Sequence, residues 1–195
     1  IRRQGIPAAW LHVRSDNSHA IHLYETLGFE ERTRRTTWNS LPEPPPQFTI
    51  PGVMIGPRRA ADWTQQRQWL SELYPEAFAW HLPLDWHALG YGIGNALYCF
   101  STLTFPRHWM ARQQNLRLGG VSWLPGNGFA DALFMAVAHD CAPGVIQALL
   151  TQVRRCAPRR KALTLNCPAD LAPEAIQSAG FYNQQTLLWM EHRFS

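Results

Sequence analysis

Residues 11–29 read LHVRSDNSHAIHLYETLGF, and the order of residue types predicts a strand, a turn and a helix in close succession. The strand is expected over Ala8–Val13, and the polar run 15–18 suits a turn in which Asn17 begins a helix. Apolar residues then recur with the spacing of one helix face as far as Leu27. Gly28 fits the position after the helix end.

The flanking residues extend this pattern in both directions. Ile1–Gly5 is predicted to be the last turn of a helix, because its two arginines suit the negative end of the helix dipole and Gly5 is a stop signal. Thr33–Trp38 is rich in β-prone threonine and is expected to form a closing strand. We therefore expect the chain to open in the middle of a helix.

This succession resembles the closing half of a Gcn5-related N-acetyltransferase (GNAT) domain. In that family a strand ends in an Asn, a short helix carries A-x-x-L-Y, and G-F leads into the next strand. The matching residues are Asn17, Ala20, Leu23, Tyr24, Gly28 and Phe29. The match indicates a family and is silent on the substrate.

The resemblance implies transfer of an acetyl group from acetyl-coenzyme A to an amine, with no metal. Tyr24 stands where the family often places a tyrosine that protonates the coenzyme A thiolate, and a phenol with a pKa of about 10 is protonated at neutral pH. Asn17 and Ala20 are the corresponding cofactor-binding positions. On spacing alone, Tyr24 would be a helix aromatic in a core and Asn17 a plain cap.

A proline-rich segment, LPEPPPQFTIPG, follows the first strand–helix–strand unit. It predicts a semi-rigid connector, because prolines lack N–H donors and favour extended backbone. We therefore expect residues 1–40 to be the C-terminal arm of a first GNAT domain, 41–51 to be a linker, and 52–195 to be a second domain.

The second domain is expected to close with the same order of elements as the first. The strands and helices predicted for it are a strand at 53–55, a helix at 60–73, a hairpin of 109–113 and 116–123, a strand at 130–138, a helix at 144–156, a strand at 161–166, a helix at 172–179 and a strand at 186–192. Gly180-Phe181 repeats Gly28-Phe29, so we interpret the chain as a degenerate tandem. The predicted class is α/β (α+β), a GNAT acyl-CoA N-acyltransferase fold with a mixed central sheet flanked by helices and a partial N-terminal copy.

The second unit is expected to have lost its chemistry. The family binds pyrophosphate with Q/R-x-x-G-x-G/A at a helix N-terminus, and in the aligned residues 141–146 only Gly144 survives, as a third cofactor-binding position. Ile146 replaces the last small residue, and Ile176 stands where Tyr24 would be repeated. Asn166 keeps the strand-end Asn, although it lies 14 residues before its glycine where the first unit has 11.

Two other motifs carry less weight. Residues 90–97, GYGIGNAL, mimic a phosphate loop, but WHLPLDWHAL precedes them and the β-prone YCFSTLTF follows, so the strand-then-helix context is missing. His12, Asp16, His19 and His22 cluster in sequence, and we interpret them as a solvated surface, since no known metal-ligand spacing is completed.

The composition limits the size of the fold and the kinds of partner that the chain is expected to bind. The 195 residues suit one domain plus part of another, and 46% hydrophobic content with nine Trp and nine Phe can build a core. The net charge of +4 is spread along the chain, so no nucleic-acid partner is expected. Four cysteines without a C-x-x-C pair indicate reduced thiols and a cytoplasmic protein, and no apolar run suits a membrane span.

The chain starts at Ile1 without Met, so the strand and phosphate loop that complete the first domain are expected upstream, and this chain alone should bind acetyl-coenzyme A poorly. The acceptor is bound in this family largely by the variable N-terminal half and stays unknown. The alternative is a non-catalytic GNAT-like module that buttresses or dimerises the first domain, as in a homodimer, or binds another small ligand.

Overall fold

The computed structural model describes residues 8–41, 43–82, 84–126, 128–157 and 161–194. The strands are β1 (Ala8–Arg14), β2 (Glu30–Ser40), β3 (Val53–Pro57), β4 (Arg107–Gln113), β5 (Leu116–Leu124), β6 (Ala130–Ala136), β7 (Ala162–Pro168) and β8 (Phe181–Arg193). The helices are α1 (Ser18–Thr26), α2 (Trp63–Leu73), α3 (Trp86–Leu89), α4 (Ile93–Thr102), α5 (Pro143–Cys156) and α6 (Pro173–Ser178), with short 3-10 helices η2 (Ala60–Asp62) and η3 (Glu76–Phe78).

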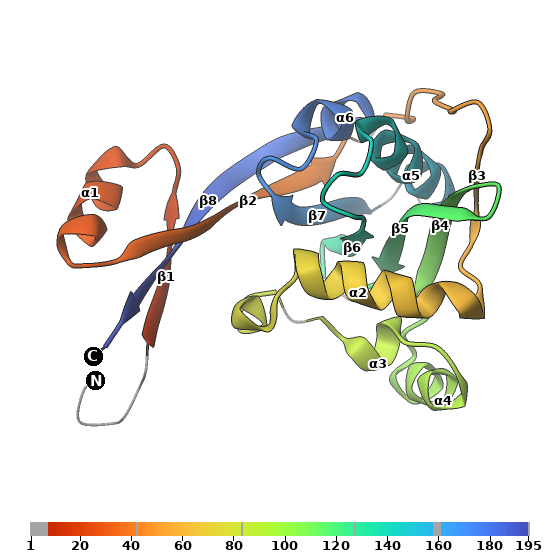
Figure 1. The fold of residues 1–195 in the computed structure, drawn as a ribbon, viewed down its shortest axis with the longest axis horizontal. Helices are drawn as coiled ribbons and strands as arrows, with labels where there is room; N and C mark the ends of the chain where they lie inside the picture. Colours follow the sequence, from red (N-terminus) through yellow and green to blue (C-terminus); the bar gives the residue numbers. More distant parts are fainter. Residues whose placement is uncertain (1–7, 42, 83, 127, 158–160, 195) are drawn as a thin grey trace.

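All eight described strands form one sheet in the order β1-β8-β2-β7-β6-β5-β4-β3. Its described pairs are antiparallel except β6–β7, which is parallel and is joined through α5 as a strand–helix–strand crossover. Figure 1 shows α5 and α6 on one side of the sheet and α2, α3 and α4 on the other. The predicted class, a single mixed sheet flanked by helices, is confirmed.

Strands from the two ends of the chain alternate in this sheet. The N-terminal segment (residues 8–40) contributes β1 and β2, and the closing strand β8 lies between them. In turn β2 lies between β8 and β7. The long ribbons of β2 and β8 run together from α1 to the body of the molecule (Figure 1).

Local signals set the ends of the two short helices as predicted. The side-chain oxygen of Asn17 accepts the N–H of Ala20 at 3.1 Å, which satisfies one of the free donors at the start of α1. Gly28 after α1 and Gly180 after α6 have φ of +83° and +82°. This left-handed backbone is strained for residues with a Cβ, so both positions favour glycine.

Three sequence expectations differ from the structure or lie outside it. Residues 98–105 were expected to be β-prone, and no helix was expected after the GYGIGNAL motif, but α4 spans Ile93–Thr102. The Asn95 amide donates to the carbonyls of His87 and Ala88 and so holds α4 against α3. The last strand starts at Phe181 rather than at 186, because its polar first residues pair with β2. The helix turn predicted for 1–5 lies outside the described residues.

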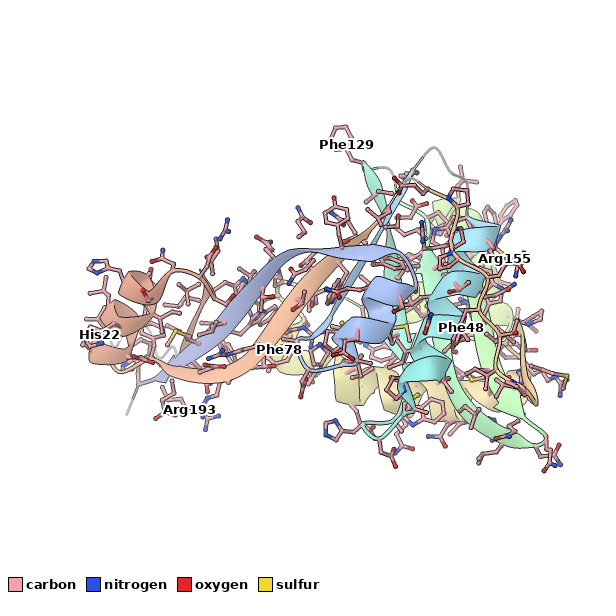
Figure 2. The ribbon with its side chains drawn as sticks, turned by 90° about the horizontal axis from the view of Figure 1, so that it is seen from above. His22, Phe48, Phe78, Phe129, Arg155 and Arg193 are labelled. Carbon is pink, nitrogen blue, oxygen red and sulfur yellow. The ribbon has the colours of Figure 1, made fainter. Side chains whose placement is uncertain are left out.

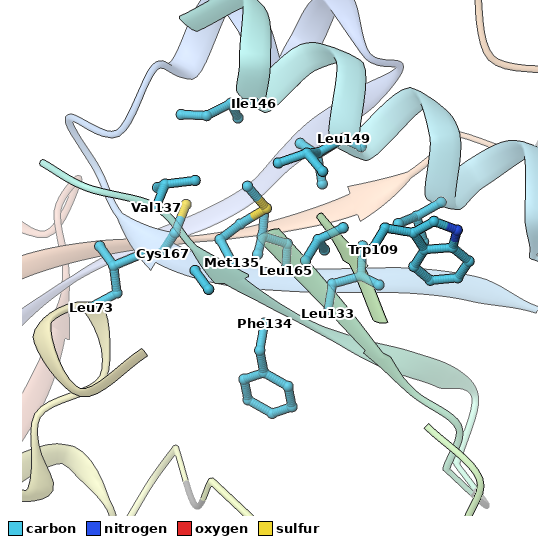
Figure 3. Packing of buried hydrophobic residues seen from close by; sticks show 14 of the residues in the cluster. Leu73, Trp109, Leu133, Phe134, Met135, Val137, Ile146, Leu149, Leu165 and Cys167 are labelled. Atoms are coloured by element: carbon cyan, nitrogen blue, oxygen red, sulfur yellow. The ribbon is translucent and has the colours of Figure 1, made fainter. Parts of the chain in front are cut away.

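The main core lies between the sheet and α5 on one side and α2 on the other. Ile146 and Leu149 of α5 point at the sheet from above, whereas Phe134 of β6 points to the opposite face (Figure 3). Ile146 and Leu149 are fully buried, and burial of such a side chain contributes about 1.5–3 kcal/mol. The large apolar content predicted to build a core does so here.

A second, smaller core lies under α1. Val13, Leu188 and Met190 are its buried members, and α1 packs on them with half-buried residues, while none of the residues of α1 is itself buried. This helix is therefore held by one thin apolar layer, so its side chains stay partly open to solvent.

Candidate functional site

Tyr24 lies on α1 with its ring half-buried in the smaller core. The ring packs edge-on against Phe29 with 5.8 Å between the ring centres, beside Met190 and Leu188. Phe29 follows Gly28 in the matched motif, so the Gly-Phe pair places an aromatic ring against Tyr24, the candidate acid. The aromatic packing expected of such a helix residue is thus present, and it leaves Tyr24 partly accessible.

Asn17 and Ala20 are brought together at the first turn of α1. Asn17 is exposed and caps the helix, as described above, and Ala20 is half-buried on the small core. The adjoining turn carries a paired Arg14 and Asp16, 2.7 Å apart, and both side chains are exposed. Beside this turn, at the carboxyl end of β1, lies a polar hollow of about 210 Å³, which β8 closes with residues 183–186.

The hollow and α1 stand at an end of the sheet. Among the described strands β1 has one neighbour, β8, so one of its edges carries unpaired backbone groups. His19 and His22 are exposed on α1, and no three His, Cys, Asp or Glu side chains of the described residues come together as a metal site would require.

In residues 52–194 a second place where a ligand could bind is the carboxyl end of the parallel pair β6–β7. The two strands pair as far as Leu133 and Leu165 and then part. Parted parallel strands leave backbone donors that a ligand or a side chain must satisfy. Here the N–H of Met135 donates to the hydroxyl of Tyr74 at 3.2 Å. Burial raises the pKa of that hydroxyl, which keeps it protonated.

Arg35 of β2 lies beside Tyr74 and contacts β7 just beyond the point where β6 and β7 part. Its side chain is 1% exposed, its guanidinium lies 5.2 Å from the centre of the Tyr74 ring, and burial lowers its pKa. The Nε–H donates to Asn166 Oδ1 at 2.7 Å and an Nη–H donates to Leu73 O at 2.9 Å. Asn166 Nδ2 in turn donates to Thr37 Oγ1. The side chain of Asn166, the strand-end Asn in residues 52–194, is therefore hydrogen-bonded to Arg35 and Thr37 of this chain.

Gly144 lies in the first turn of α5, where residues of the proline-rich segment cover it. A Cβ built there would be 3.4 Å from Ile50 Cδ1 and 3.8 Å from Phe48 Cζ. Figure 2 shows Phe48 beside this helix. Pro143 opens α5 and no side chain caps it. The side of Gly144 on which a Cβ would lie thus faces apolar side chains, which does not favour phosphate there.

An aromatic group around His12 was missed by the sequence interpretation. His12 was assigned to a solvated cluster, but its ring lies 4.1 Å from Trp189, 4.7 Å from Trp80 and 4.4 Å from His81. Burial first, and then His81, lowers the pKa of His12 to about 4, so the ring is neutral at physiological pH. The signal available in the sequence was the alternation of Trp10 and His12, which puts both on one face of β1.

Comparisons with known proteins bear on the fold. No family model and no curated protein matches the chain. Among solved structures, a GCN5-related N-acetyltransferase from Sphaerobacter thermophilus superposes with a TM-score of 0.60 at 13% identity, over 95% of this chain and 59% of that one. One from Kribbella flavida gives 0.58 at 10%, over 95% and 68%. A tandem GNAT protein from the clavulanic acid biosynthesis pathway gives 0.54 at 15%, over 98% and 66%.

This chain therefore has the fold of the GCN5-related N-acetyltransferases. It spans 59% of the length of the Sphaerobacter protein. At these identities the likeness establishes the fold alone. None of the described helices has the length and apolar character needed to cross a membrane.

Proposed function

We propose that this chain is part of a tandem GNAT-family N-acetyltransferase that transfers an acetyl group from acetyl-coenzyme A to an amine. The reactive site belongs to the N-terminal segment, with Tyr24 as general acid and Asn17 and Ala20 as cofactor contacts. The observation that supports this proposal most is the succession of elements in residues 8–40. It joins strand, Asn cap, helix with a half-accessible tyrosine, left-handed glycine and strand within a GNAT fold.

The tandem part of the proposal is supported by the strand register. Thr36 of β2 stands opposite Thr186 of β8, and their hydroxyls are 2.9 Å apart. On its other side Thr36 pairs with Cys167 at the end of β7, while the N–H of Ser15, just past β1, donates to Thr186 O. The two halves are thus arranged alike around the Thr36–Thr186 pair, and each closing strand lies between strands of the other half.

The same comparison favours the N-terminal segment as the reactive one. Where β6 and β7 part, Tyr74 accepts the N–H of Met135, and Arg35 of the N-terminal segment donates to Asn166. At the start of α5, Gly144 lies against Ile50 of the proline-rich segment. Ile176, at the position of Tyr24, is fully buried and has no proton to donate. The second unit then acts as a scaffold that supplies β8 to the first.

The chemistry asks little of the protein. The lone pair of the acceptor amine attacks the thioester carbonyl carbon, the carbon–sulfur bond breaks, and the nitrogen loses a proton. The Tyr24 hydroxyl gives its proton to the departing thiolate, which a neutral phenol can do. The nitrogen gives its proton to water, and the Tyr24 phenolate takes one back from water, so no net proton is gained or lost. Proximity of amine and thioester supplies much of the rate.

The test is Tyr24→Phe in the natural full-length protein, with thiol release from acetyl-coenzyme A measured over a panel of primary amines. Loss of a general acid should lower kcat about 100-fold or more. Tyr182→Phe is the matched control, because this tyrosine is 46% exposed on β8 and lies outside the motif. An unchanged rate in Tyr24→Phe removes Tyr24 as the acid, and acetylation of no amine removes the function.

The second candidate, a non-catalytic module, is favoured for residues 52–194 by the Tyr74 hydroxyl that accepts the N–H of Met135 where β6 and β7 part. Calorimetry with acetyl-coenzyme A on this chain separates the two roles. Weak binding is expected, and micromolar affinity that survives Tyr24→Phe and is lost in Gly144→Leu would place the cofactor in the second unit instead.

A further inference from the structure

We propose that a cavity beside β3 and β4 binds a small anionic ligand, a carboxylate or phosphate with a flat apolar body. The cavity has a volume of about 370 Å³ and is lined by Pro57, Arg58, Tyr91, Arg107, His108 and Trp109. Pockets of this size hold small molecules. It lies toward the β3 end of the sheet, whereas β1 and its hollow form the other end, so this site does not depend on the proposed acetyltransferase site.

Arg58 brings a partly buried positive charge to this cavity. Its guanidinium donates to Leu89 O at 2.6 Å, Gly90 O at 2.5 Å and Gln66 Oε1 at 3.0 Å. All three acceptors are neutral, and a guanidinium has five N–H donors. A charge removed from water is costly until an opposite charge joins it. Burial lowers the pKa of Arg58 to about 10, which leaves it protonated at neutral pH.

The nearby carboxylate is already engaged by other groups. Asp62 forms ion pairs with Arg112 and Arg117, and it accepts the backbone N–H of Arg59. Both of its oxygens are thus used, and it acts on Arg58 only through its charge, which partly offsets the lowering of the Arg58 pKa by burial. Among the described residues no carboxylate lines the cavity with Arg58. The cavity walls therefore carry the charge of Arg58 and Arg107 with no anion of the described chain hydrogen-bonded to Arg58.

His108 adds an oriented neutral donor. Gln66 Nε2 donates to Ser122 Oγ at 2.9 Å, and the Ser122 hydroxyl is 2.8 Å from His108 Nδ1. Since Ser122 and Gln66 are fully buried, the single hydroxyl proton is best used toward Nδ1, which places the ring proton on Nε2. Burial first, and then Arg58, lowers the pKa of His108 to about 3, so the ring stays neutral. Nε2–H is then a donor for an anion.

Aromatic rings give the site its preference for a flat ligand. The Arg58 guanidinium lies 5.0 Å from the centre of the Trp63 ring and 5.9 Å from that of Tyr91. Tyr91 and Trp109 line the cavity, and Tyr91 is 57% exposed. Arg107 is exposed and lies over Trp123 at 5.3 Å. Trp63 and Trp123 thus hold the two arginines and are not among the lining residues, so Tyr91 and Trp109 are the lining rings that would face the body of an anion.

The experiment uses benzoate and phenyl phosphate as probes, with benzyl alcohol as the neutral control, in calorimetric titrations of this chain. The anions are expected to bind at least tenfold more tightly than benzyl alcohol, and the better of the two identifies the anionic group. Arg107→Gln is expected to weaken their binding about tenfold, the loss of one charge-assisted hydrogen bond. Arg155→Gln, an exposed arginine on α5 (Figure 2), removes the same charge elsewhere and should leave binding unchanged.

Equal affinity for benzoate, phenyl phosphate and benzyl alcohol would overturn the proposal, as would no binding of either anion at millimolar concentration. Equal effects of Arg107→Gln and Arg155→Gln would also overturn it, by reducing the attraction to net charge. Arg58→Lys keeps the charge and loses the forked donors, so it should weaken anion binding. If that variant fails to fold, the exposed Arg107 still decides.

Discussion

Gly180→Ala should destabilise this protein far more than the equivalent change at Gly28. Gly180 follows α6 with φ of +82°, and a Cβ there would lie 1.9 Å from an Nη of Arg154. Arg154 is 7% exposed and donates to Ala179 O at 2.7 Å, and also to the carbonyls of Leu41 and Glu43. In Gly180→Ala the new Cβ therefore displaces the Arg154 guanidinium. The hydrogen bonds that connect α5 to the turn after α6 and to the start of the proline-rich segment are then lost.

The magnitude has two parts. A left-handed backbone costs a residue with a Cβ about 1–2 kcal/mol. Displacing Arg154 leaves the buried carbonyl of Ala179 without its charged donor, which costs about 1.5–3 kcal/mol, while water can replace the two bonds nearer the surface. We expect Gly180→Ala to lower the free energy of unfolding by about 2.5–5 kcal/mol.

Gly28→Ala is the matched control. Gly28 has φ of +83°, but the nearest atom to its Cβ would be His192 Nδ1 at 3.0 Å, on a half-buried ring. The bond of this ring to Gly28 O is exposed, so water can replace it when the ring moves. Only the backbone cost of about 1–2 kcal/mol is expected. The assay is urea unfolding followed by tryptophan fluorescence, read from the midpoint at unchanged slope. Equal losses in the two variants would refute the reasoning, as would an undiminished cost of Gly180→Ala in an Arg154→Met background.

Two further predictions concern buried ionisable side chains, those of His108 and Arg35. His108 has a pKa of about 3 in the folded chain against 6.5 unfolded, so the unfolded state binds more protons between these values and the free energy of unfolding falls as pH falls from 6.5 toward 3. His12, with a pKa of about 4, contributes to that slope in the same direction. His108→Gln should therefore reduce the slope in urea titrations at pH 7, 6, 5 and 4 without abolishing it, and an unchanged slope would contradict the assignment. Arg35→Met should cost about 2–4 kcal/mol, because Asn166 and Leu73 O lose their donor. Arg34→Met, next to it but exposed, should cost at most about 1 kcal/mol, and similar losses in both variants would count against this account.

Short-range patterns in the sequence were enough for much of the fold. Three features depend on residues only a few positions apart, and they can therefore be predicted from the sequence. They are the cap at Asn17, the glycines after α1 and α6, and the order of strands and helices. The resemblance to the GNAT family rested on the same local order, and the fold comparison agrees with it. Where a local pattern was ambiguous, as in α4, the contact of Asn95 with α3 decided for helix.

The sequence could not place side chains that meet across the chain. Arg35 and Asn166 are 131 residues apart, and nothing near either one predicts that they meet beside Tyr74 where β6 and β7 part. His12 looked solvated among polar neighbours until Trp189 and Trp80, from distant elements, enclosed it. The residues 11–29 by themselves determined a strand, a capped helix and a turn. Only the tertiary structure decided that β8 runs between β1 and β2, because strand order depends on backbone pairing between segments that the sequence keeps far apart.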